Sequence, residues 1–241
     1  MQPKLQTLAA RAFTLVEMLI VIGVIALLAA MVFPIAGAVK RTQIRTRARG
    51  ELVQMETAIE AYKAKLGYYP PDNAPNYVSN QLYFELLGTT NIGTAAAPVF
   101  RTLDESAQIA ATSFNTVFGP NVSGFMNCAR GGGGDEGPTA VSFLRGLKPG
   151  QAGELVQPAP APGTPPVKLL VGISWPADNP NPPVLAPPAK AAGLNPWRYN
   201  SSNPIKNPKS FDLWIDVKVG DKTNRICNWS DQPLIVAAPY P

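Results

Sequence analysis

The chain has 241 residues, carries a formal net charge of +5 and contains no histidine. The lack of histidine excludes Ser-His-Asp and Cys-His catalysis and every metal site that has a histidine ligand. The length is sufficient for one globular domain with its own hydrophobic core, in addition to an apolar N-terminal stretch.

That apolar stretch covers residues 13–39 and reads FTLVEMLIVIGVIALLAAMVFPIAGAV, with Glu17 as its only charge. The uncharged part, residues 18–39, is long enough to cross the roughly 30 Å hydrocarbon core of a bilayer as a helix. A carboxylate near the edge of such a span costs free energy, so Glu17 needs a compensating partner. Pro34 lacks the amide that would bond to the carbonyl of Ala30, which predicts a kink at this position.

The residues that open this stretch resemble the class III signal of type IV pilins and type II secretion pseudopilins. A leader, residues 1–12, contains Lys4 and Arg11 but no acidic residue and ends in the small residue Ala12. The sequence Phe-Thr-Leu-Val-Glu then follows from Phe13 onward. The resemblance implies that a prepilin peptidase cuts before Phe13 on the cytoplasmic side and methylates the new amine. The family usually has Gly where this chain has Ala12, which bears on the efficiency of cleavage.

The resemblance also implies roles in fibre assembly for three residues. The Phe13 amine would pair with Glu17 of a neighbouring subunit, residues 19–32 would form the surface on which helices pack, and the helix could unwind near Pro34 when filaments form. The implied partners are the prepilin peptidase, other copies of the chain and related pilins, and an assembly machine in the inner membrane.

Two other interpretations of the apolar stretch are less consistent with its details. A secretory signal peptide has a shorter apolar core, and its small-residue cleavage site follows that core instead of preceding it. A plain single-span anchor accounts for the hydropathy but leaves Glu17 unexplained.

A basic cluster follows the apolar stretch and consists of Lys40, Arg41, Arg45, Arg47 and Arg49. No aromatic residue is interleaved, so nucleic-acid binding is not indicated, and a solvated helix face or contact with lipid headgroups fits better. The positive-inside rule would place the chain after this cluster in the cytoplasm, whereas the resemblance places it in the periplasm. We follow the resemblance, because residues 13–17 are the more specific signal.

Apolar residues continue beyond the basic cluster with helical spacing, at Ile44, Ala48, Leu52, Met55, Ile59, Tyr62 and Leu66. Spacings of three and four residues predict one stripe of an α-helix that ends at Gly67, before Pro70 and Pro71. The Gly-Tyr-Tyr-Pro ending also resembles the close of the first helix in the major pseudopilin subfamily.

The middle of the chain is less regular. Residues 77–87 suit a short helix with Ser79 as its N-cap. Gly131 to Gly134 lack the Lys-Ser/Thr ending of a phosphate-binding loop and indicate a flexible surface loop. A proline-rich insertion at about 157–189 excludes long helices and predicts one strand, of the edge type, within residues 168–175.

Residues 211–219 alternate between apolar and polar side chains, which predicts a half-buried strand with Asp212, Asp216 and Lys218 on its solvent side. Residues 220–222 form a turn, and residues 223–229 return as a second strand. Because a sheet with one apolar face needs a cover, we expect the helical stripe to pack on this hairpin. The fold class is therefore α+β and pilin-like: a long N-terminal helix on a small antiparallel sheet, with loop-rich insertions.

The C-terminal region strengthens the resemblance to major pseudopilins. Asn195-Pro196-Trp197 with Tyr199, and Phe211-Asp212-Leu213, are similar to that subfamily's Asp-Pro-Trp-Gly…Tyr and Phe-Asp-Leu signatures, although Asn195 and Arg198 depart from them. The subfamily binds calcium in the loop after Phe-Asp-Leu, where Asp216 and Asp221 are the nearest carboxylates in this chain. Calcium needs six to eight oxygen ligands. Two acids on a solvated hairpin is therefore the simpler interpretation, and the sequence does not assign a metal.

Cys128 and Cys227 could pair in an oxidising compartment or remain buried thiols, and the sequence favours neither. The expected organisation is a cytoplasmic leader at 1–12, a transmembrane and assembly helix at 13–39, its continuation at 40–66, and a periplasmic globular domain at 67–241. The expected function is non-enzymatic: a structural subunit of a pseudopilus or type IV pilus-like fibre, supporting type II secretion. The alternative is a membrane-anchored periplasmic enzyme or binding domain.

Overall fold

A computed structural model describes residues 13–129, 139–155, 165–176 and 194–236, without the side chains of residues 31–36. The chain divides into two compact units, residues 1–43 and 44–241. Helix α1 (Leu15–Leu66) contributes residues to both units. The leader at 1–12, the side chain of Pro34, the glycine run at 131–134 and most of the proline-rich insertion lie outside the described residues.

The predicted helical stripe is the face of α1 that the second unit buries. Ala48, Leu52, Met55, Ile59 and Tyr62 are all at most 4% exposed, and Ile44 and Leu66 pack against the same core from the two ends. The helix ends where the sequence predicts. Gly67 adopts a φ of 88° and its N–H donates to the carbonyl of Lys63 at 2.8 Å, a conformation that favours glycine.

The described residues of the second unit form three sheets. The elements after α1 are α2 (Leu82–Leu87), β1 (Thr89–Asn91), β2 (Val99–Thr102), β3 (Gln108–Ala110), the short 3-10 helix η1 (Ala111–Ser113), α3 (Phe114–Val117), β4 (Cys128–Ala129), β5 (Ala152–Leu155), β6 (Val167–Leu170), β7 (Arg198–Asn200), β8 (Asp212–Val219), β9 (Lys222–Cys227) and β10 (Ser230–Ile235). Their strand orders are β3-β2-β1-β4, β10-β9-β8-β7 and β5-β6.

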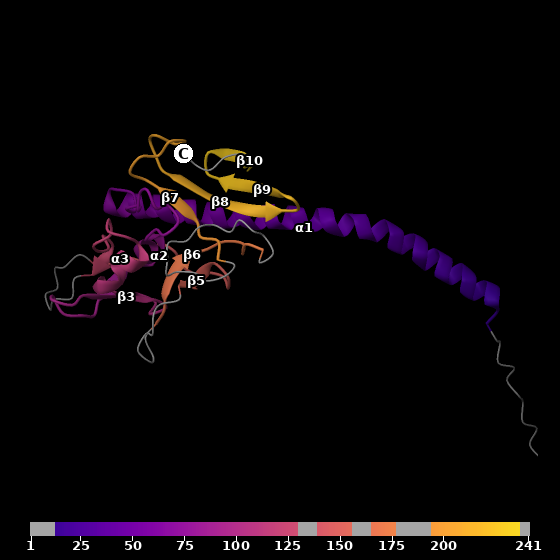
Figure 1. Cartoon of the computed structure of the whole chain (residues 1–241), viewed down its shortest axis with the longest axis horizontal. Helices are drawn as coiled ribbons and strands as arrows, with labels where there is room; N and C mark the ends of the chain where they lie inside the picture. Colours follow the sequence, from indigo (N-terminus) through magenta and orange to yellow (C-terminus); the bar gives the residue numbers. More distant parts are fainter. Residues whose placement is uncertain (1–12, 130–138, 156–164, 177–193, 237–241) are drawn as a thin grey trace, which may run out of the picture. The chain divides into compact units, whose positions relative to one another are not determined.

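The antiparallel sheet β10-β9-β8-β7 lies along the second part of α1 (Figure 1) and contains the predicted hairpin. Its register pairs Ile215 with Ile226 and Val217 with Asn224 on the face toward the core. The predicted apolar residues of β8 are buried, so the long helix on an antiparallel sheet is confirmed. The strand is not half-buried, however, because Asp212 and Trp214 on its other face are also at most 1% exposed.

Each of these two residues is covered by groups from outside β8. The rings of Tyr77 and Trp229 both lie 5.8 Å from that of Trp214. The Asp212 carboxylate accepts hydrogen bonds from the backbone N–H groups of Ile205, Lys206 and Asn207, each at 2.8 Å. The prediction that Asp212 faces solvent is therefore wrong: this carboxylate holds the β7–β8 loop closed over the sheet.

The first sheet has no counterpart in the sequence analysis. Strands β1, β2 and β3 form an antiparallel meander, and β4 joins β1 in parallel. An aromatic cluster includes Phe100 of β2, and its rings pack edge-on, tilted or stacked with centroids 4.8 to 6.3 Å apart: Phe84, Phe100, Phe114, Phe118 and Phe125. The short helix before this sheet begins at Leu82 without a side-chain cap, so Ser79 is not its N-cap.

A buried polar cluster joins α1 to the first sheet. Glu85 on α2 is fully buried and accepts hydrogen bonds from Tyr62 Oη and from the backbone N–H groups of Met126 and Asn127. The Asn127 side chain continues the network, because it donates to the carbonyls of Glu85 and Val141 and accepts from the N–H of Val141. One carboxylate and one amide thus connect four separate segments.

The strand predicted within the proline-rich region is β6, which begins at Val167 and, among the described strands, pairs with β5 alone in a two-stranded antiparallel sheet. Among the residues that the structure describes, we find no helix with a stretch both long and apolar enough to qualify as a membrane span.

Candidate assembly site at the start of the helix

The first turn of α1 is closed by its own side chains. Thr14 precedes the helix, and its N–H and its hydroxyl both donate to Glu17 Oε2, at 2.9 and 2.8 Å. In return the N–H of Glu17 donates to Thr14 Oγ1 at 3.2 Å. This reciprocal pair is a capping box, which satisfies amides that have no partner within the helix. Glu17 therefore has an intrachain role.

The sequence analysis gave Glu17 only an intersubunit role and missed Thr14. The signal was present, because Thr-x-x-Glu directly before an apolar run is the pattern of a capping box. Phe13, the residue expected to carry the new amine, is 70% exposed beside this cap. Ala12 and the Pro34 side chain are not described, so the structure brings together Phe13, Thr14 and Glu17 only.

A large apolar surface follows the cap directly. The big apolar side chains between Leu15 and Leu28 are between 46% and 80% exposed, and they occur on all sides of the helix. A surface of this size is far larger than the apolar patches that soluble monomers expose, so it indicates a surface that other molecules cover.

The basic cluster is only partly solvated, contrary to the prediction. The Arg49 guanidinium donates to the carbonyls of Cys227 and Ser230, at 2.9 and 3.0 Å, and to the Asp231 carboxylate at 2.8 Å. Arg45 donates to Asn224 Oδ1 at 3.1 Å, and Arg47 pairs with Glu51 one turn on. Three of the five cations thus fasten or brace the helix within the second unit.

The two candidate metal ligands lie in different parts of the β8–β9 hairpin, Asp216 in the middle of the paired strands and Asp221 in the turn. Both carboxylate oxygens of Asp216 accept hydrogen bonds from Arg225, at 2.8 and 3.0 Å. Asp221 is in the exposed turn, where its carbonyl accepts from Lys218 Nζ. No group of three or more Cys, Asp and Glu side chains in the described part of the chain is arranged to hold a metal ion.

The two cysteines are both free thiols and lie on different sheets, Cys128 on β4 and Cys227 on β9. Cys227 is 1% exposed, and burial raises the pKa of its thiol. A buried thiol with a raised pKa is a poor nucleophile, so Cys227 acts here as a small apolar core residue.

Comparison with known families identifies the N-terminal region. The family model of the prokaryotic N-terminal methylation motif matches residues 8–33, which include the cap and the exposed apolar surface between Leu15 and Leu28. No curated protein and no solved structure matches the chain. A motif of this kind at residues 8–33 supports a type IV pilin-like precursor that is anchored in the membrane and processed by a prepilin peptidase, and it favours a structural role.

Proposed function

We propose that the chain is the subunit of a pseudopilus, a type IV pilus-like fibre that supports type II protein secretion. The observation that carries the proposal is the exposed apolar helix surface between Leu15 and Leu28, directly behind the cap and within the methylation motif. In a fibre this surface is covered by the same segment of other copies. The resemblance of residues 195–199 and 211–213 to major pseudopilins favours secretion over other fibres.

In this proposal the precursor waits in the inner membrane with residues 1–12 in the cytoplasm and the domain from Gly67 onward in the periplasm. Cleavage before Phe13 creates an amine, and its reference pKa of about 7.7–8.0 leaves much of it charged at neutral pH. Glu17 of a neighbouring copy then neutralises that amine. Pairing of the two charges offsets the cost of placing either in an apolar helix bundle.

Removal of Glu17 tests the proposal most directly. The chain with Glu17→Ala should insert into the membrane and fold normally, because loss of a carboxylate makes insertion easier. It should be at least tenfold depleted from sheared fibres, while the membrane fraction retains it. The exposed Glu105 provides the control, and Glu105→Ala should enter fibres as wild type does. Equal incorporation of the Glu17→Ala chain would remove Glu17 as the assembly counter-ion.

Processing gives a second, independent measurement. Intact mass of the membrane-extracted protein should correspond to a chain that begins with methylated Phe13, and Ala12→Gly should speed its appearance. A mature protein that still begins at Met1 in cells with an active prepilin peptidase would favour a plain membrane anchor.

A further inference from the structure

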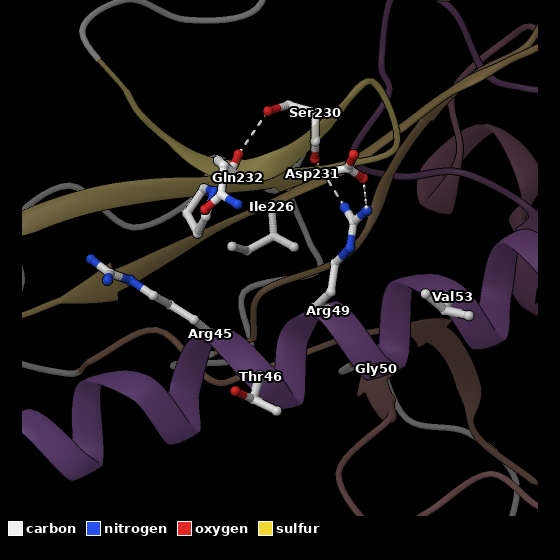
Figure 2. A pocket seen from close by; sticks show the side chains of 10 residues that line it. Arg45, Thr46, Arg49, Gly50, Val53, Ile226, Ser230, Asp231 and Gln232 are labelled. Carbon is white, nitrogen blue, oxygen red and sulfur yellow. Dashed lines mark hydrogen bonds and ion pairs between the residues drawn. The ribbon is translucent and has the colours of Figure 1, made fainter.

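A groove runs between α1 and the outer edge of the β7–β10 sheet, entirely within the second unit. It has a volume of about 600 Å³, and Figure 2 shows the helix along one side and β10 along the other. Thr46, Gly50 and Val53 line the helix side, and Ile226 and Pro233 add apolar surface on the sheet side. The dashed contacts of Arg49 to Ser230 and Asp231 close one end, while Arg45 extends along the other (Figure 2).

Gly50 has no explanation within the described part of the chain. It lies in the interior of α1 with an ordinary helical φ, where Gly is less favourable than Ala. A Cβ built on Gly50 meets no atom within 4 Å. By contrast, a Cβ on Gly172 would lie 2.5 Å from Ile215 Cδ1, so the need for that glycine is evident in the fold. Without a side chain, Gly50 leaves the helix backbone accessible from the groove, although no contact within the described part of the second unit requires a glycine there. This points to a neighbouring molecule that approaches the backbone of α1 at Gly50.

The two ends of the groove carry opposite charge. The N-terminal end has exposed Arg45, preceded on the same helix by Lys40 and Arg41. The C-terminal end has Asp231, whose side chain is 95% exposed, and Glu56 and Glu60 follow on the next turns of α1, beyond the residues that line the groove. Burial raises the pKa of Glu56, the charge of Arg49 lowers it, and repulsion from Glu60 and from Asp231 raises it further. The acidic end would therefore gain from one more cation.

We infer that this groove is the docking surface for a second copy of the chain, which lies parallel to the first and is displaced along α1. A parallel arrangement rests on the proposed function, in which all N-terminal helices enter the fibre in the same direction. Arg45 of one copy then meets the acidic end of the next copy. Arg45 is 11 residues before Glu56 and 15 before Glu60, which corresponds to a displacement of about 16 to 22 Å at 1.5 Å per residue.

Such a contact uses two different surfaces of the same chain, the basic end of one copy and the acidic end of another. A head-to-tail contact forms a closed ring only when the rotation between neighbouring copies returns to the starting copy. Otherwise it propagates into a helical filament. The groove would thus fix the axial stagger of neighbouring globular domains, while the apolar helix segments supply most of the buried surface.

The test fills the groove in the full-length chain. Gly50→Leu adds bulk at a position whose Cβ would meet no atom of the described chain within 4 Å, and Gly124→Leu is the matched control at another open glycine. Both variants should be retained in the membrane and unfold near the wild-type temperature. Gly50→Leu should be at least tenfold depleted from sheared fibres, and Gly124→Leu should be incorporated as wild type is.

Charge reversal tests whether the groove binds a second copy of the chain, and it does so without filling the groove. Arg45→Glu and Glu60→Arg should each reduce fibre yield at least tenfold, and the two changes in one chain should restore it, since each contact then has the opposite polarity. This pair of variants also decides the matter if Gly50→Leu fails to fold.

The results of these tests distinguish a wrong docking surface from a wrong proposed function. If Gly50→Leu and the single charge reversals enter fibres normally while Glu17→Ala does not, the docking surface is wrong and the fibre proposal stands. If the chain with both Arg45→Glu and Glu60→Arg gives no more fibre than the single variants, the proposed displacement between neighbouring copies is wrong. If the wild-type chain forms no fibres in cells that process it, the proposed function fails and the docking surface fails with it.

Discussion

The hydroxyl of Tyr62 donates a hydrogen bond to Glu85 Oε2 at 2.9 Å, and neither side chain is exposed to solvent. This contact joins the continuation of α1 to α2 and, through Asn127, to the first sheet. It is the one place in the described core where a carboxylate from the short helix bonds to a side chain of the long helix.

Glu85 should make the stability of the second unit depend on pH. Burial raises the pKa of Glu85 above its ordinary value of 4.5, against the effect of its three hydrogen-bond donors. The folded chain therefore binds this proton more tightly than the unfolded chain, and the stability linked to it is present at low pH and is lost as pH rises through the raised pKa. Unfolding of the detergent-extracted chain should show this slope above pH 4.5.

The variant Glu85→Gln isolates that effect, because Glu56 titrates in the same direction. The difference in unfolding free energy between wild type and Glu85→Gln should change with pH over that window, whereas a constant difference would exclude Glu85 as the titrating group. At neutral pH, Glu85→Gln should lower the free energy of unfolding by about 1–3 kcal/mol, because the buried hydrogen-bond donors lose one acceptor oxygen.

Gly172→Ala should destabilise the second unit by about 1–3 kcal/mol, the usual cost of overpacking a core. The new methyl group would lie 2.5 Å from Ile215 Cδ1 and 3.1 Å from Glu51 Oε2. Gly124→Ala is the control, since its Cβ meets no atom within 4 Å. Chemical denaturation of both variants measures the difference, and equal midpoints would show that the sheet can move away from α1 at no cost.

Asp212→Asn should loosen the β7–β8 loop without disturbing the sheet below it. The amide replaces one of two acceptor oxygens, so at least one of three backbone N–H groups loses its partner, at about 1–3 kcal/mol. Amide hydrogen exchange at residues 205–207 should become faster, while exchange in β8 and β9 should not change. The exposed Asp221→Asn serves as the control, and faster exchange throughout the sheet would contradict a local role.

Thiol labelling can measure whether Cys128 and Cys227 are free in the cell. Protein isolated without reductant and then unfolded should react at both Cys128 and Cys227 with a thiol reagent, and the folded protein should react mainly at the partly exposed Cys128. Absence of reactive thiols before reduction would show that the two residues pair in the cell.

The sequence predicted the features that depend on neighbouring residues and missed those that depend on contacts between separate segments. The stripe from Ala48 to Tyr62 and the core face of β8 were predictable, because both depend on local periodicity. Strands β1 to β3 have three or four residues each, too few to show an alternating pattern. The burial of Asp212 depends on amides of a loop that folds back over the strand, and the role of Arg49 depends on carbonyls almost 180 positions later in the chain. Spacing along a chain carries no information on such contacts.

The cap at the start of α1 also separates two possible effects of Glu17. Thr14→Ala removes the cap but keeps the carboxylate, so fibre yield should fall by less than threefold, in contrast to the loss expected for Glu17→Ala. Equal loss for the two variants would mean that helix capping, and not charge, accounts for the requirement.

In the proposed fibre, the capping box makes the pairing of Glu17 with a neighbour's amine an exchange of one contact for another. A carboxylate that already accepts two hydrogen bonds from Thr14 has to give up part of that bonding, or share it, when a neighbour's amine arrives. The free energy gained at each junction is then a difference between two similar contacts, smaller than either of them. A subunit that leaves the fibre recovers its own cap at once, so the Glu17 contact adds little to the free energy that removal of a subunit costs. A fibre built on such junctions would be suited to repeated extension and retraction.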